Sequence, residues 1–348
     1  MNAMERVTAM LSHKEVDRIP VYPILSGVTR KLVGATYEEW ATNAYVCADA
    51  LYKAVKQFDL DGVVTLIDLS VECDAWGQKL IFHENDAPHP DYSQSVIQDI
   101  EDYAKIKKAD YKQSKRMMMH IEVCRQLVEK ANGEFPVTAF VFGPLGTLSM
   151  LRNQEDMYMD LYDDPDAVKE AVGEVTETLK DYVNALIDTG IQGVMFDTLF
   201  ASGTIMSKDM WIEMESDAIK VLADVCHERG VLVMIHNCGE KPYFDAQIEA
   251  TNPIAFSFLH PPADCADFAE CKEKYGKTLG LIGCVPPPMV VTSTDEAWVE
   301  ECKRQIDIFG KDSGYMLATG CEYPSGSDFR KVELMVEVAK TYTPYKEA

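Results

Sequence analysis

The sequence predicts an α/β protein folded as a closed (β/α)8 TIM barrel, and three observations support this fold class. Short apolar runs of strand length recur along the chain, and a helical pattern separates each run from the next. Eight such runs can be distinguished, which is the number that closes this barrel. Several runs end in a polar or reactive residue, as expected where barrel strands meet at one open face. A doubly wound open sheet is the alternative arrangement.

The predicted elements begin with an amphipathic helix over residues 2–16, in which Val7, Met10 and Leu11 share one face. The strands that follow are recognised as nearly continuous apolar runs, because strands of a parallel barrel are buried on both faces. The eight strands are expected at residues 18–24, 62–68, 136–143, 193–197, 231–238, 253–260, 278–284 and 314–321. Further helical patterns cover residues 36–58, 149–189, 207–229, 294–309 and 328–340.

A long section, residues 69–135, separates the second strand from the third. It is expected to contain an irregular loop at 83–92, which has two prolines and mixed charge, and a helix at 106–132. A plain crossover needs less chain, so this section is interpreted as an insertion after the second strand. The chain shows no internal repeat or linker, and its 348 residues are expected to form one domain, 1–348.

The composition excludes some classes of partner. The net charge of −24 argues against nucleic acid and anionic membranes, because both would repel the chain. No stretch approaches the roughly 20 apolar residues of a membrane span, and the first residues form no signal-peptide-like run. These features predict a cytoplasmic protein whose ten cysteines stay reduced. Reduced thiols in such a protein are mostly core residues, but some serve as metal ligands.

Two of the predicted strands end in residues that can bind a metal. The strand at 231–238 ends in His236 and Cys238, which lie two apart and therefore project from the same face of an extended chain. The last strand ends in Cys321, which again has a glycine beside it. One imidazole and two thiolates form a ligand set for tetrahedral zinc with an open fourth position. The alternative is that both thiols are inert core residues.

Other strand ends provide candidates for substrate orientation and proton transfer. Asp68 and Asp197 end the second and fourth strands, and Glu72 follows one turn beyond Asp68. These carboxylates can orient a substrate or a ligating imidazole, or take part in ordinary salt bridges. His260 ends the sixth strand and is a candidate displaceable ligand, a proton-transfer group or a purely structural histidine. Cys284 ends the seventh strand, where a buried wall is the expected role.

Two sequence motifs resemble a known family. They are Ile235-His-Asn-Cys-Gly239 and Ala318-Thr-Gly-Cys-Glu-Tyr-Pro324. Both resemble the uroporphyrinogen decarboxylase superfamily, and most closely its corrinoid-dependent methyltransferase branch, which includes the methylcobalamin:coenzyme M methyltransferases. The resemblance spans nearly the whole chain. Supporting matches are Asp17-Arg-Ile-Pro20, Phe142-Gly-Pro144 and Ile205-Met-Ser207.

The resemblance implies a (β/α)8 barrel with zinc held by His236, Cys238 and Cys321. It also implies methyl transfer between a cobalamin on a separate corrinoid protein and a small substrate. That substrate is either a thiol acceptor such as coenzyme M, or a donor of the methyl ether or methylamine type. Decarboxylation of uroporphyrinogen is the alternative function. That branch holds its octacarboxylate substrate through an arginine-rich motif, whereas here only Arg18 and Arg30 flank the corresponding stretch, and the net charge of −24 disfavours such a substrate.

Overall fold

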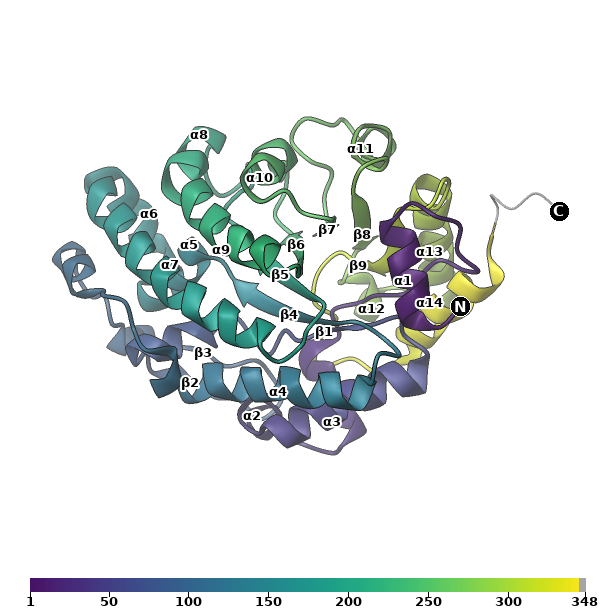
Figure 1. Cartoon of the computed structure of the whole chain (residues 1–348), viewed down its shortest axis with the longest axis horizontal. Helices are drawn as coiled ribbons and strands as arrows, with labels where there is room; N and C mark the ends of the chain where they lie inside the picture. Colours follow the sequence, from purple (N-terminus) through teal and green to yellow (C-terminus); the bar gives the residue numbers. More distant parts are fainter. Residues whose placement is uncertain (344–348) are drawn as a thin grey trace.

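The centre of the protein is a parallel sheet of seven strands, seen in a computed structural model that describes residues 1–343 (Figure 1). The strands follow one another in chain order, and each pairs in parallel with the next. Such an arrangement curls the sheet into a barrel. The strands are β1 (Val63–Val64), β4 (Val137–Phe142), β5 (Gly193–Asp197), β6 (Leu232–Asn237), β7 (Ala255–Phe258), β8 (Gly280–Val285) and β9 (Tyr315–Thr319).

The eighth strand position is occupied by the stretch around Val21, which forms a parallel bridge to Leu317 of β9. On its other side, the Asp61 backbone N–H donates to the Val21 carbonyl at 3.0 Å, just before β1. Seven of the eight predicted strands are confirmed, and the first, at 18–24, is present only as this bridge between β9 and the start of β1. It contributes only a bridge because Pro20 and Pro23 have no backbone N–H to donate to a longer ladder.

Helices surround the sheet (Figure 1). The predicted helix at 149–189 consists of three helices, because Asn153 and Asp164 each cap a new one. Three short helices, α10, α11 and α12, were not predicted, since eight residues or fewer carry little periodic signal. The helices are α1 (Ala3–Leu11), α2 (Tyr37–Thr42), α3 (Ala44–Phe58), α4 (Lys115–Ala131), α5 (Pro144–Leu151), α6 (Gln154–Asp163), α7 (Pro165–Ile187), α8 (Lys208–Trp211), α9 (Asp217–Glu228), α10 (Phe244–Thr251), α11 (Phe268–Tyr275), α12 (Met289–Thr292), α13 (Asp295–Phe309) and α14 (Arg330–Thr341).

The insertion after β1 contains more regular structure than predicted. Its supposed loop at 83–92 includes β3 (His89–Pro90), which pairs antiparallel with β2 (Leu80–Ile81). The expectation of an entirely irregular loop was therefore wrong, because a two-residue ladder is too short to show an alternating pattern. The other segments of regular structure outside the main sheet and helices are η1 (Ser26–Leu32), η2 (Glu72–Trp76), η3 (Tyr92–Gln94), η4 (Ile100–Lys105), η5 (Tyr111–Gln113) and the π-helical turn η6 (Ile212–Ser216).

Apolar side chains fill the barrel and seal one end of it. Met195, Met234 and Met316 belong to one inner cluster, which also includes Val7 and Leu11 of α1. The predicted apolar face of α1 is therefore buried, and this helix covers the end at which the strands begin. Within residues 1–343, none of the helices combines the length and the apolar character that a membrane crossing requires.

Candidate metal centre at the barrel mouth

His236 lies at the C-terminal end of β6 and is 2% exposed. Its side chain projects to the same side of the strand as that of Met234, two residues earlier, which lies in the inner cluster of the barrel. On the next strand, Ser257 is its register partner, and the Ser257 Oγ lies 3.0 Å from His236 Nδ1. This hydrogen bond holds the imidazole plane and leaves Nε2 available for another partner.

Cys238 and Cys321 meet His236 at this mouth. The ligand atoms of the three residues all lie within 4.8 Å of one another. Both cysteines are half-buried, and neither forms a disulfide. The structure therefore brings together the three residues that the sequence proposed as metal ligands, although Cys238 and Cys321 are 83 positions apart in the sequence. One nitrogen and two sulfur ligands fit tetrahedral zinc, which binds such mixed sets of ligands.

The small and polar residues of the two motifs have clear local roles. The Asn237 side chain donates to the Thr198 carbonyl at 2.7 Å and accepts from the Gly239 N–H at 3.0 Å. A Cβ atom on Gly239 would lie 2.3 Å from the Ser202 hydroxyl, and one on Gly320 would lie 2.6 Å from a backbone atom. Only glycine allows these close approaches, which pack the Cys238 segment against Ser202 and the Cys321 segment against Leu259.

The pKa shifts within the cluster favour the binding of a metal cation. A hydrogen bond from Cys238 and the neighbouring His236 hold the pKa of the Cys321 thiol below its usual value, against the effect of burial. Burial alone would lower the pKa of His236, but its interactions with Cys321 outweigh this and raise it. The three residues therefore stabilise negative charge on sulfur beside a proton that a metal ion can replace.

Asp197 lies next to this cluster. It ends β5 and is the register partner of His236 on the neighbouring strand. Its carboxylate is 4% exposed, and its Oδ1 has no hydrogen-bond partner among residues 1–343. Burial raises the pKa of Asp197 to about 7, despite the opposing effect of His236. An unpartnered buried oxygen of this kind is a typical feature of functional sites.

The other predicted site residues have different surroundings. Asp68 forms a buried ion pair with Arg116, with 2.9 Å between Oδ1 and Nη1. Glu72 accepts a hydrogen bond from the Phe142 N–H at 3.2 Å, and burial raises its pKa to about 8.

His260 follows β7, remains partly exposed and is not a member of the group of ligand atoms. Cys284 is buried inside β8, and burial raises the pKa of its thiol.

Sequence reasoning missed three residues of this face. Ser257 orients His236, and the register of two adjacent strands could have pointed to it. Glu322 directly follows Cys321 in a motif already noted; burial, with the nearby Cys321, raises its pKa to about 7 although its surface is partly exposed. Arg116 lies in the insertion, 48 residues from its partner Asp68, and no sequence signal connects the two.

The uroporphyrinogen decarboxylase (URO-D) family model matches residues 2–342 of this chain. The chain belongs to the uroporphyrinogen decarboxylase family. Among curated relatives, methylcobamide:CoM methyltransferase MtaA of Methanosarcina barkeri is 22% identical over 344 residues, covering 97% of each chain. A uroporphyrinogen decarboxylase of Thioalkalivibrio sulfidiphilus is 21% identical over 354 residues, covering 96% of each. The resemblance noted in the motifs is therefore confirmed.

Solved structures agree with the fold of this family member. A methyltransferase from Methanosarcina mazei superposes with a TM-score of 0.80 at 21% identity, covering 97% of this chain and 98% of that one. A B12-independent methionine synthase from Shewanella sp. W3-18-1 has a TM-score of 0.57 at 13% identity, covering 93% and 96%. At these identities the likeness concerns the fold, and the chemistry must be argued from the site.

Proposed function

We propose that this family member is a zinc-dependent methyltransferase. It would move a methyl group between a cobalamin carried by a separate corrinoid protein and a small substrate. The observation that carries the proposal is the group formed by His236, Cys238 and Cys321 at the barrel mouth. Zinc bound there would lower the pKa of a substrate thiol or hydroxyl, or stabilise the heteroatom that loses a methyl group. The relative named as a methylcobamide:CoM methyltransferase, similar over 97% of each chain, supports the same reading.

The residues around the three ligands would have distinct roles. Ser257 keeps the His236 ring in one orientation, so that Nε2 is the nitrogen presented to the metal. Asp197 would take up, at Oδ1, the proton that a substrate thiol or hydroxyl releases, since that oxygen has no other partner among the described residues. Asp68, held by Arg116, would orient the substrate from the other side of the mouth. His260, at the partly exposed rim, is a second candidate for proton transfer.

Two directions of methyl transfer are compatible with this site. In the first, a thiol such as coenzyme M accepts the methyl group. In the second, a compound of the methyl ether or methylamine type donates it to the corrinoid. We further propose that residues 1–348 act as one barrel domain in the cytoplasm, where reducing conditions keep Cys238 and Cys321 available for zinc.

Uroporphyrinogen decarboxylation is the second candidate, because curated relatives with that name are also 21–23% identical. The positions of the two flanking arginines argue against it. Arg18 pairs with Asp61 at the opposite end of the barrel, with 2.6 Å between Nη1 and Oδ2. Arg30 is buried and donates to the carbonyls of Gly27 and Ser325. Neither guanidinium is therefore free to receive a carboxylate of a porphyrinogen.

Metal analysis of the purified protein tests the proposal first. We expect about one zinc per chain in the native protein and little in Cys238→Ser or Cys321→Ser, because each variant removes one of three protein ligands. Cys284→Ser is the matched control, since this cysteine lies inside β8 and should not change the zinc content.

An activity assay then separates the functions. Methylcobalamin mixed with the protein and a thiol should show the spectral change of demethylation if the thiol accepts the methyl group. No change with thiols, but methylation of added cob(I)alamin by a methyl ether or methylamine, would select the second direction. A metal-free protein that decarboxylates uroporphyrinogen would overturn the proposal.

A further inference from the structure

A second concave site lies on the same side of the barrel, away from the three metal ligands. It is a cleft of about 340 Å³ between the end of α2, the hairpin formed by β2 and β3, and the first turns of α4. Helices of a barrel begin at the end where the strands finish, so the N-terminus of α4 belongs to the mouth side of the molecule. None of the residues that line this cleft is a candidate metal ligand.

The inner surface of the cleft is mainly apolar. Ala41, Leu80, Phe82 and Met119 contribute to its lining. Cavities that bind small molecules typically combine such an apolar lining with a few fixed polar groups. The volume suits a compact organic molecule rather than a lone ion.

Three cations face or border the apolar surface. Lys79 and Lys115 are exposed at the rim, and neither forms an ion pair with any of residues 1–343. Arg116 lies deeper, is 6% exposed, and its guanidinium carbon is 5.7 Å from the centre of the Phe82 ring. The Arg116 Nε is buried without a hydrogen-bond partner among the described residues. Asp68 offsets the charge of Arg116, and Asp74 also lines the cleft, so the free positive charge comes from Lys79 and Lys115. In a chain with a net charge of −24, these two unpaired cations favour an anionic ligand.

The walls of the cleft are held in place before any ligand binds. Asp74 accepts hydrogen bonds from the Ser114 hydroxyl at 2.7 Å and from the Arg116 N–H at 3.3 Å, which ties the η2 segment to the start of α4. Gln78 is buried, and its Oε1 accepts from the Val96 N–H at 3.0 Å. A preformed site of this kind loses little entropy on binding.

We propose that this cleft binds a small amphipathic anion, with an apolar body against Phe82 and Met119 and one carboxylate, sulfonate or phosphate group near Lys115 at the rim. The Arg116 guanidinium holds Asp68, so occupation of the cleft is linked through one side chain to the barrel mouth. The inference does not depend on the proposed metal chemistry, because the cleft shares no residue with the candidate metal ligands, and Arg116 is the one residue that connects the cleft to Asp68.

Two fluorescent probes test this site on the full-length protein. The first is the anion 8-anilinonaphthalene-1-sulfonate, and the second is its uncharged analogue N-phenyl-1-naphthylamine. We expect saturable binding of the anion, with the Kd raised at least about tenfold in Lys115→Glu, because a repulsive charge replaces an attractive one. Lys112→Glu, the same change three residues earlier and outside the cleft, should leave the Kd within about twofold.

The apolar part is tested separately. Phe82→Ala should weaken binding of both probes, whereas Lys115→Glu should leave binding of the uncharged probe unchanged. Thermal unfolding of each variant shows whether it is folded. The proposal is overturned if Lys115→Glu and Lys112→Glu have equal effects on the anion, if the uncharged probe binds as tightly as the anion, or if Cys238→Ser at the mouth abolishes anion binding.

Discussion

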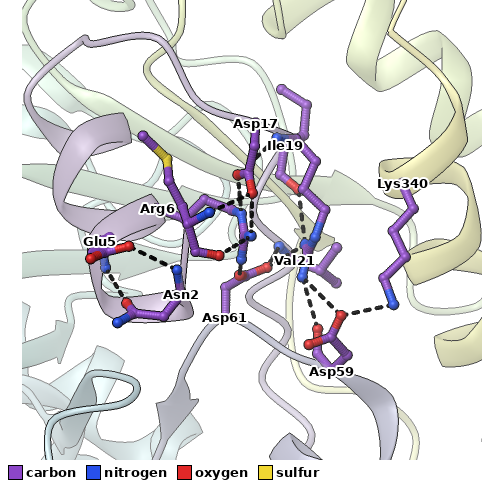
Figure 2. Close-up of polar contacts among 11 residues, drawn as sticks. Asn2, Glu5, Arg6, Asp17, Ile19, Val21, Asp59, Asp61 and Lys340 are labelled. Carbon is purple, nitrogen blue, oxygen red and sulfur yellow. Dashed lines mark hydrogen bonds and ion pairs between the residues drawn. The ribbon is translucent and has the colours of Figure 1, made fainter.

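The two ends of this barrel hold polar side chains in opposite ways. At the end where the strands begin, buried charges are paired with opposite charges, as Figure 2 shows for the arginines and aspartates around Asp61. At the mouth, Asp68 is paired with Arg116, but Glu72 and Asp197 each keep one buried oxygen without a partner among residues 1–343, and two thiols face an imidazole. The difference indicates that the first end serves stability, whereas the second keeps its polar groups available for ligands.

Asp61 is the centre of the paired network. It is fully buried; its Oδ1 accepts from Arg6 Nη1 at 2.5 Å and its Oδ2 from Arg18 Nη1 at 2.6 Å. The same Oδ2 accepts from the Val21 N–H at 2.7 Å. The network therefore supports the barrel at the one strand position where prolines prevent a longer ladder, and Arg6 also lowers the pKa of Asp17 through a hydrogen bond.

The mouth also contains buried carboxylate oxygens that have no partner among the described residues. Glu72 Oε2 and Asp197 Oδ1 are buried without hydrogen-bond partners among residues 1–343. Burial raises the pKa of Glu72 to about 8 and that of Asp197 to about 7. The pKa values show the same difference. Burial raises the pKa of carboxyl groups at the mouth, whereas the hydrogen bond from Arg6 lowers the pKa of Asp17 at the opposite end.

The largest expected effect concerns the paired end. Asp61→Asn should lower the free energy of unfolding by about 3–5 kcal/mol, because it leaves two buried guanidinium groups without their shared carboxylate. Asp59→Asn is the control, since the Asp59 side chain is 63% exposed and should cost less than about 1 kcal/mol. Urea unfolding measures both. Similar losses in the two variants would contradict a stabilising role for the buried network.

Metal removal tests the mouth. Zinc at a hundredfold excess over its Kd should stabilise the native protein by about 2.7 kcal/mol relative to chelator-treated protein. The same treatment of Cys321→Ser should change the stability little, because one of three ligands is missing. Thermal unfolding with and without chelator measures the difference. An equal response of both proteins would show that zinc acts elsewhere.

A smaller change is expected when only the support of a ligand is removed. Ser257→Ala deletes the partner of His236 Nδ1 and should weaken zinc binding about tenfold, while the ligand set stays complete. Competition with a chromophoric chelator measures the affinity. Ser293→Ala removes a partly exposed hydroxyl at the C-cap of α12; it provides the control and should leave the affinity unchanged. An unaltered affinity in Ser257→Ala would remove this residue from the site.

The smallest effect is a pH dependence caused by Glu72. Its pKa of about 8 in the folded protein lies above its ordinary value of 4.5, so the folded state keeps a proton that the unfolded state loses. Stability from this group is present below pH 4.5 and decreases as the pH rises to about 8, by about 1 kcal/mol between pH 6 and 7. Glu72→Gln should remove this part of the slope, whereas Glu38→Gln on the exposed surface should not. Urea unfolding at both pH values measures it; identical slopes in native protein and Glu72→Gln would exclude this origin.

Comparison of the expected and observed elements shows what a linear pattern can reveal. The strands were predictable because a strand buried on both faces is a continuous apolar run, as in Gly193–Asp197. The helices α10 and α11 were not, because two turns at the surface need few apolar residues. The hairpin of β2 and β3 was not predicted for a related reason, because a strand of two residues cannot display an alternation of apolar and polar side chains.

For the site, the same distinction holds between near and distant residues. His236 and Cys238 were recognisable together because their spacing on a strand gives them a common face. Arg116 was not recognisable as the partner of Asp68, because an ion pair between an inserted helix and a strand end has no local signature. His260 occupies the predicted strand end but lies outside the group of ligand atoms, since the direction of a side chain after a strand depends on the loop.

The amino-acid sequence by itself determined the class of fold, the order of the strands and the kinds of ligand atoms available at their ends. These follow from hydrophobic burial and strand periodicity, which act over a few residues. Only the tertiary structure decided which of those atoms meet, which carboxylates remain unpartnered and where a second cleft opens. Such properties depend on barrel closure, which places residues from distant strands at one mouth and excludes water from some of them but not from others.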